Sequence, residues 1–448
     1  MNSVGTGQGD QRLLPRPSSV VAPRLAPGVE LLGPYRDSGL ENPPYLVRRR
    51  GTVLQVSRLL YVIAAGVNAR NDYDDIATVA SAELGRQLSA DQVRYLIEEK
   101  LVPVGIVAPG GSVGHTPVRR GTDNRTLALR YRLAVVPPEV VDRTAQILQR
   151  LFRRPVVVGL LTGVVGLDAW VLGAHGVKAG LDQVLEQPGP LALVLALTWL
   201  SIAFHELGHA AACRYSGARP GAIGAGVYLI WPVFYTDVTD SYRLGRAGRL
   251  RTDLGGIYFN IVFIVMLFAV YGASGYEPLL AAVVVQHFLI LDQLIPWIRL
   301  DGYYVVSDLT GVPDILERVR PALLSLIPGR PRHPKIAALR PGARRLLFAY
   351  LGSLAIFTVF ALVSTIRHGP EMITVSWEHL PKHVDALKTA IGMWDLPMGV
   401  LIVLQIAVAL APAVGAALMV GFLASRLVQR LSRSQGVRPT RTAGLRSG

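Results

Sequence analysis

Long apolar stretches separated by polar connections dominate the chain from about residue 156 onwards. Each stretch holds about 20 residues, which is enough for a helix to cross roughly 30 Å of hydrocarbon. The six stretches are Val156–Gly176, Leu191–Cys213, Leu254–Ala273, Pro278–Ile298, Leu346–Ile366 and Met398–Leu423. The pattern therefore predicts a mainly α, polytopic membrane helix bundle of about six transmembrane helices. Asp168 interrupts the first stretch, which could be a shorter or tilted segment.

The pattern before residue 156 is that of a small soluble unit. Tyr45–Val47 and Thr52–Val56 flank a polar turn and predict a short hairpin. Apolar positions on one face predict a helix over Asp74–Leu84, and the capping-box pattern from Ser89 to Gln92 predicts the start of another. A hairpin followed by helices is the outline of a winged-helix-like α/β domain.

These patterns divide the chain into five parts. Residues 1–40 are rich in Pro, Gly and Ser without periodicity and predict a disordered lead-in. The parts that follow are a winged-helix-like cytosolic domain (41–110), a connector with an amphipathic helix (111–155), a transmembrane domain (156–424) and a basic cytosolic tail (425–448). The N-terminus lacks an apolar core of signal-peptide length, which predicts that it stays in the cytosol.

Composition and charge agree with a membrane protein. Of the 448 residues, 51% are hydrophobic and 17% are charged, whereas a soluble domain carries about 25% charged residues. The net charge of +15 suits either nucleic acid or the cytosolic face of a bilayer. Six, nine and six Lys and Arg residues lie in 214–252, 299–345 and 425–448, against one in 177–190 and three in 367–397. Six crossings of the cell membrane with both termini in the cytosol satisfy this asymmetry, so no nucleic acid is expected as a partner.

The second apolar stretch contains the sequence His205-Glu206-Leu207-Gly208-His209. Histidines four residues apart lie on one face of a helix, so both imidazoles can bind one zinc ion with Glu206 beside the reacting water. This is a zincin motif, and three ionisable groups within a membrane segment are costly without a function. We therefore predict His205 and His209 as zinc ligands and Glu206 as the general base. The single cysteine, Cys213, excludes a site built on several thiolates.

A catalytic zinc usually has three protein ligands, so a third must come from elsewhere in the chain. Asp301, just past the fourth apolar stretch, is the best candidate because the predicted orientation brings it to the level of the histidines. Asp292 and His287 compete as ligands, but they lie deeper in the bundle and are better explained by packing or hydrogen bonding there.

Together these residues resemble the site-2 protease family of intramembrane zinc metalloproteases. In that family the aspartate of a Leu-Asp-Gly motif is the third zinc ligand, which corresponds here to Asp301 in Leu300-Asp301-Gly302. The run from Gln293 to Gly302 is similar to the family's Asn-Leu-x-Pro-x-x-x-Leu-Asp-Gly, with Gln293 in place of the asparagine. Gly256 and Asn260 keep the places of the family's Gly-Pro-x-x-Asn, but Ile257 replaces its proline. The resemblance implies that Asn260 supports the substrate or the active site; an inter-helix hydrogen bond is the alternative.

Two further resemblances concern the substrate. The run Pro232–Leu244 is similar to bacterial peptide zinc metalloproteases within this group, and it contains Asp237 and Asp240, to which we assign no role. Residues 45–106 are similar in pattern to PqqD-like winged-helix domains, which bind leader peptides of ribosomally made peptides. This implies a leader peptide as a partner of the N-terminal domain.

The function predicted from these residues is hydrolysis of a peptide bond in a peptide or membrane-protein substrate by zinc-activated water. Residues 218–252 are rich in Gly and β-forming residues and could offer the substrate an edge strand, or could be an ordinary loop. The alternatives are a catalytically inactive membrane sensor and a peptide-export component, each using the N-terminal domain for recognition.

Overall fold

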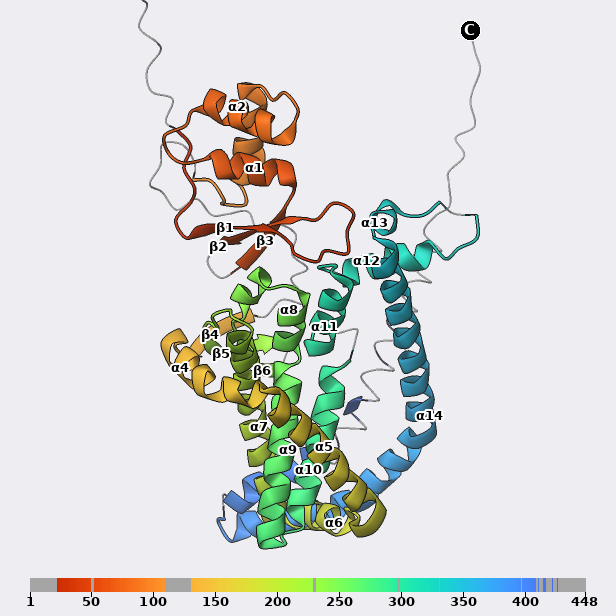
Figure 1. Cartoon of the computed structure of the whole chain (residues 1–448). Coiled ribbons are helices and arrows are strands. Elements are labelled where there is room, and N and C mark those ends of the chain that lie inside the picture. The colour runs from red at the N-terminus through yellow and green to blue at the C-terminus, as the bar shows by residue number, and fades with distance from the viewer. Residues whose placement is uncertain are drawn as a thin grey trace, which may run out of the picture.

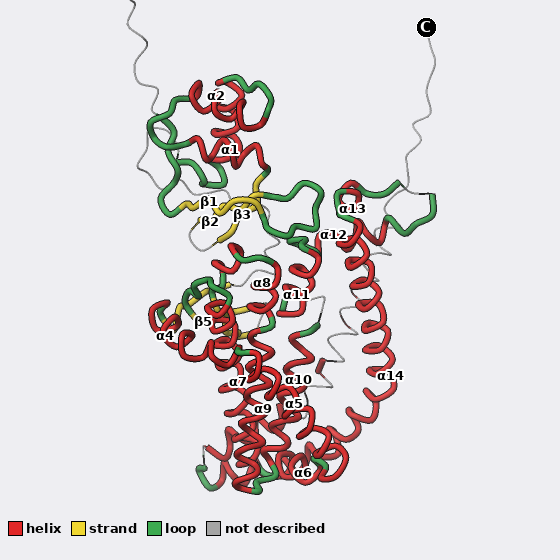
Figure 2. The backbone as a smooth tube through the Cα atoms, in the orientation of Figure 1, coloured by secondary structure: helices red, strands yellow, loops and turns green. Residues whose placement is uncertain are grey.

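The computed structural model describes residues 22–49, 52–108, 130–228, 231–295, 299–329, 331–395 and 397–407, with isolated positions up to residue 425. The fold is mainly helical. An N-terminal unit of strands and short helices lies at one end of a bundle of long helices (Figure 1). The strands form two separate groups, one in that unit and one beside the upper part of the bundle (Figure 2).

The N-terminal unit is a three-stranded sheet packed against three helices. Its antiparallel strands, in the order β1-β2-β3, are β1 (Val29–Pro34), β2 (Tyr45–Arg49) and β3 (Thr52–Val56). Its helices are α1 (Arg58–Gly66), α2 (Tyr73–Leu84) and α3 (Ala90–Leu96), which a π-helical turn (Ile97–Leu101) extends. The predicted hairpin, helix and capping box are all confirmed, since Ser89 and Gln92 cap each other's backbone at the start of α3.

The prediction that residues 1–40 form a disordered lead-in is wrong for its second half, while residues 1–21 lie outside the described residues. Strand β1 pairs with β2, and the segment after it runs onto the helical bundle. There the Tyr35 hydroxyl donates to Asp308 Oδ1 at 2.7 Å, and Leu40 forms a β-bridge with Leu339. These partners are distant in sequence, so local composition carried no signal of them.

Eleven labelled helices are described from residue 138 onwards, and a further helix, Pro397–Ala407, follows them. The labelled helices are α4 (Pro138–Leu148), α5 (Arg154–Trp170), α6 (Lys178–Glu186), α7 (Pro188–Tyr215), α8 (Arg246–Asp253), α9 (Gly255–Ser274), α10 (Pro278–Gln293), α11 (Asp301–Thr310), α12 (Leu316–Leu324), α13 (Pro334–Ala337) and α14 (Pro341–Gly392). Shorter turns are 3₁₀-helical at Gln149–Phe152 and Thr239–Arg243 and π-helical at Val171–His175. The main apolar core of the bundle lies where α5, α7, α9 and α10 meet.

Four helices in the described part of the chain are long and apolar enough to cross a membrane, so the protein has the helices of a membrane protein. They are Arg154–His175, Pro188–Tyr215, Gly255–Ser274 and Pro341–Ser364. The fourth predicted stretch forms the shorter helix α10, and of the sixth only Pro397–Ala407 is described as a helix. The loop predicted over residues 367–397 is instead mostly helical, because α14 continues to Gly392. The tail from residue 426 lies outside the described residues.

A second antiparallel sheet lies beside α7. Its order is β4 (Arg130–Val136), β5 (Ile223–Tyr228) and β6 (Trp231–Thr236), so β6 is an edge strand. The β-forming residues of 218–252 therefore build a hairpin rather than an ordinary loop. Strand β4 comes from the predicted connector and joins β5 across a long sequence separation. The amphipathic helix expected in that connector is α4.

Candidate metal centre

The two histidines of the zincin motif lie one turn apart on α7 and are both buried. Their Nε2 atoms are 3.1 Å apart, so the rings point at a common position. Close packing of α7 against α9 encloses this position. A Cβ atom on Gly208 would lie 2.3 Å from the carbonyl oxygen of Gly255, so the two backbones touch at the level of the motif, as small residues allow at helix interfaces.

A backbone carbonyl fixes the orientation of His209. The Nδ1 atom of His209 lies 2.8 Å from the Thr252 carbonyl oxygen at the end of α8. A carbonyl can only accept, so Nδ1 carries the proton and donates it. When His209 is neutral, its lone pair is on Nε2, which faces His205, and this is the tautomer that a metal ligand requires.

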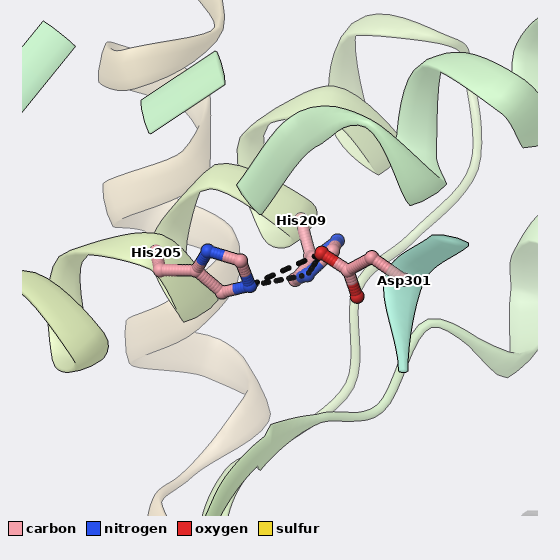
Figure 3. Close-up of side chains that lie close together, drawn as sticks. All are labelled: His205, His209 and Asp301. Carbon is pink, nitrogen blue, oxygen red and sulfur yellow. Dashed lines mark hydrogen bonds and ion pairs between the residues drawn. The ribbon is translucent and has the colours of Figure 1, made fainter. Parts of the chain in front are cut away.

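Asp301 completes the cluster from the first residue of α11. Its Oδ2 atom lies 3.2 Å from His205 Nε2 and 3.3 Å from His209 Nε2 (Figure 3). Burial by itself would raise the pKa of Asp301, but the neighbouring imidazoles of His209 and His205 hold it well below its usual range. The carboxyl group is therefore ionised and can serve as a ligand.

The spacing of these three atoms suits a tetrahedral metal ion. Ligands at about 2.0–2.1 Å from a tetrahedral zinc lie about 3.3 Å from one another. The three separations here are 3.1, 3.2 and 3.3 Å. Among the described residues, Oδ2 of Asp301 is buried and accepts no hydrogen bond of good geometry, which leaves it in need of a cation. The residues present therefore fit a zinc ion.

Glu206 is held next to this cluster by the end of strand β6. The Thr236 hydroxyl oxygen lies 2.7 Å from Glu206 Oε2 and 2.9 Å from the Glu206 carbonyl oxygen. The Glu206 side chain is buried, as a general base shielded from bulk water should be. Sequence reasoning assigned Thr236 no role because nothing local distinguishes it. The available signals were the β-forming character of its neighbours and its place in the run Pro232–Leu244.

Asn260 lies one turn after Gly256 on α9 and is 3% exposed. A Cβ atom on Gly256 would lie 2.4 Å from the His205 ring, so this face of α9 is turned to the metal cluster. Asn260 Oδ1 is buried and has no hydrogen-bond partner in the described part of the chain. The Oδ1 atom is thus available to a ligand, and it gives no support to the alternative of an inter-helix hydrogen bond.

The other ionisable residues considered from the sequence lie outside this cluster. His287 Nε2 contacts Asp168 Oδ2 at 3.1 Å, which joins α10 to α5, and Asp292 is exposed. In the loop after β6, Asp240 pairs with Arg48 of the N-terminal sheet at 3.0 Å. Asp237 Oδ1 accepts a hydrogen bond from the Thr239 backbone at 3.0 Å, so both carboxylates have structural partners.

Comparison with known proteins relates part of the chain to a curated protein. The chain is 27% identical over 109 residues to a protein of Bacillus subtilis (strain 168) named "Putative peptide zinc metalloprotease protein YydH". The aligned part is 24% of this chain and 43% of that protein, so the match spans less than half of the relative's length. It relates the chain to a zinc metalloprotease and agrees with the donor set of the cluster. No family model and no solved structure matches.

Proposed function

We propose that this protein is a membrane-embedded zinc metalloprotease of the site-2 protease type, which hydrolyses peptide bonds in a peptide or membrane-protein substrate. The observation that carries the proposal is the meeting of His205, His209 and Asp301 at the separations of a tetrahedral zinc site, with Glu206 beside them. The four apolar helices support a place in the cell membrane. We propose six crossings with both termini in the cytosol.

The residues divide the chemistry between them. His205, His209 and Asp301 would hold a zinc ion, which when bound polarises the scissile carbonyl and acidifies the attacking water. Glu206 takes the proton of that water and later delivers it to the leaving amine, so no acyl-enzyme is needed. Asn260 contributes its amide to the substrate or to the active site. Close packing at Gly208 and Gly255 holds α7 and α9 together at the level of these residues.

Strand β6 supplies a place for an extended substrate. It is an edge of its sheet and ends at Thr236, whose hydroxyl contacts the general base. An extended peptide can add to such an edge through backbone hydrogen bonds. We propose that the scissile segment pairs there.

The N-terminal domain would select the substrate by binding a leader peptide. Strand β3 is also an edge strand, and a surface cavity of about 610 Å³ lies at its end. A second cavity of about 410 Å³ shares Leu59 with the first and reaches Tyr95 on α3. Together they offer a surface of apolar and polar residues on which a peptide could bind. An inactive membrane sensor or an export component would use the same surface without the metal chemistry.

Catalysis is tested with purified full-length protein and fluorescently labelled β-casein, an unstructured general substrate. Glu206→Gln keeps the shape of the side chain but cannot take a proton, and it should lower hydrolysis by at least about 100-fold with zinc content unchanged. Glu186→Gln, at an exposed site on α6, serves as the control. Equal hydrolysis by Glu206→Gln and the parent would refute the protease proposal.

Recognition is tested separately by capture of peptides from a random library on the full-length protein. Leu59→Glu places a charge between the two cavities and should abolish enrichment of bound peptides, while Glu206→Gln should retain it. Retention of a double-stranded DNA oligonucleotide in place of peptides would contradict the leader-peptide proposal.

A further inference from the structure

The contact between Thr236 and Glu206 joins two segments that the sequence keeps 30 positions apart. One hydroxyl faces two acceptors of the same residue, the carboxylate Oε2 at 2.7 Å and the carbonyl oxygen at 2.9 Å. A threonine hydroxyl has a single proton, so it can donate fully to only one of them. A bond to an ionised carboxylate is about twice as strong as one to a neutral carbonyl, which favours the carboxylate.

The place of Thr236 is fixed by the hairpin and by α7. At the base of the hairpin, Gly221 donates its backbone N–H to the Asp237 carbonyl at 2.7 Å, and Asp237 donates its own to Ala222 at 2.9 Å. Two residues before Thr236, the ring of Phe234 meets Trp199 of α7 edge-on, with centroids 6.2 Å apart. Strand β6 is therefore held to the base of its hairpin by backbone hydrogen bonds and against α7 by the Phe234 ring, so the hydroxyl of Thr236 has little freedom to move away.

We propose that Thr236 is a positioning residue for the general base. Its hydroxyl holds Oε2 of Glu206 and so leaves Oε1 to receive the proton of the attacking water. This inference rests on the protease function proposed above and adds a residue to it. A base already held in one rotamer does not have to lose conformational entropy to reach the productive orientation during the reaction. This is the advantage of a preorganised site.

The alternative is a purely structural role, in which Thr236 only donates a hydrogen bond to the Glu206 carbonyl oxygen and so stabilises the packing of the hairpin. The two roles predict different results for two substitutions. Thr236→Val keeps the shape and removes the hydroxyl, whereas Thr236→Ser keeps the hydroxyl and removes a methyl group. Thr162→Val is the matched control, because its hydroxyl bonds within α5 to the Val158 carbonyl at 2.8 Å.

The first measurement is steady-state hydrolysis of labelled β-casein by the full-length zinc protein. Thr236→Val should lower kcat by about 10- to 100-fold with KM within about twofold, as expected for losing a hydrogen bond to a charged catalytic group. Thr236→Ser should stay within about threefold of the parent. Zinc content and thermal unfolding of all three variants should match the parent.

A second measurement needs no turnover. Acetohydroxamate must give up a proton as it chelates a metal, so its affinity for the cobalt-substituted protein, followed by visible absorption, reports whether the base is in position. Thr236→Val should bind it about tenfold more weakly, and Thr236→Ser like the parent.

The outcomes separate this inference from the proposed function. Parent-like kcat and acetohydroxamate affinity in Thr236→Val, or equal losses in Thr236→Val and Thr236→Ser, would overturn the role of the hydroxyl. Loss of zinc or of folding in Thr236→Val would show a structural role and would overturn it as well. The protease proposal itself fails only if Glu206→Gln hydrolyses casein as the parent does.

Discussion

Gly256 of α9 lies against His205 of α7 so closely that a Cβ atom at this position would be 2.4 Å from the Nε2 atom of the imidazole. The same Cβ atom would be 2.5 Å from Nε2 of His209. Real Cβ atoms do not approach other heavy atoms so closely, so only glycine leaves the two ligand nitrogens free to converge. The glycine thus belongs to the candidate metal centre although it has no side chain.

Gly256→Ala should therefore weaken zinc binding although it changes no ligand. We expect at least a tenfold loss of zinc affinity, comparable to losing a group that orients a metal ligand. The measurement is competition with a zinc chelator followed by metal analysis. Gly272→Ala on the same helix is the control, because a Cβ atom there has nothing within 4 Å. Equal zinc affinity of the two variants would show that the rings can move aside.

Removal of the third ligand should cost far more than removal of a neighbouring aspartate. Asp301→Ala should lower zinc affinity by more than about 100-fold, since it deletes one of three protein ligands. Asp292→Ala should leave it unchanged, because Asp292 is exposed and lies outside the cluster. Metal analysis of the purified variants decides this. Strong zinc loss from Asp292→Ala instead would reassign the third ligand.

The segment after β1 is anchored by a buried arginine. Arg249 is 1% exposed; its Nε donates to Asp308 Oδ1 at 2.8 Å, and its guanidinium lies 4.4 Å from the centroid of the Tyr35 ring. Arg249→Met leaves Asp308 without its ionic partner and should destabilise the fold by about 3–5 kcal/mol. This destabilisation is measured as a lower thermal midpoint and as faster proteolysis near residue 35. Arg143→Met, at an exposed site on α4, should change neither.

Stability should also depend on the protonation of Asp253. Burial, reinforced by the nearby Asp308, raises the pKa of Asp253 well above its ordinary value. The pKa of Asp253 is higher in the folded state than in the unfolded state. The contribution of this carboxyl group to folding stability is therefore complete below the unfolded pKa of about 3.9 and is lost as pH rises through the folded pKa. Asp253→Asn cannot ionise, so it should lose less stability than the parent as pH rises.

This is measured as the thermal midpoint of metal-free parent and variant between pH 5 and pH 9. The thermal midpoint of Asp253→Asn minus that of the parent should increase with rising pH. Asp91→Asn, at an exposed site in the first turn of α3, should follow the parent at every pH. Parallel curves for Asp253→Asn and the parent would contradict the raised pKa.

Features that depend on neighbours along the chain could be predicted without the structure. The spacing of His205 and His209 is sufficient because a helix turn places them on one face. The capping box at Ser89 and the hairpin Tyr45–Val56 are local in the same sense. Asp301 is distant in sequence from the histidines, and its prediction needed the topology argument that brought two helix ends to one level and the resemblance of Leu300-Asp301-Gly302 to a family motif.

The sequence by itself predicted the apolar helices, the candidate metal ligands and the candidate general base, because these predictions follow from periodicity and from the chemistry of a few side chains. Only the tertiary structure decided which threonine contacts Glu206, which carbonyl orients His209 and where residues 22–40 lie. Hydroxyl and carbonyl groups occur throughout any chain. Their roles depend on packing between segments far apart in sequence, and such contacts leave no periodic signal.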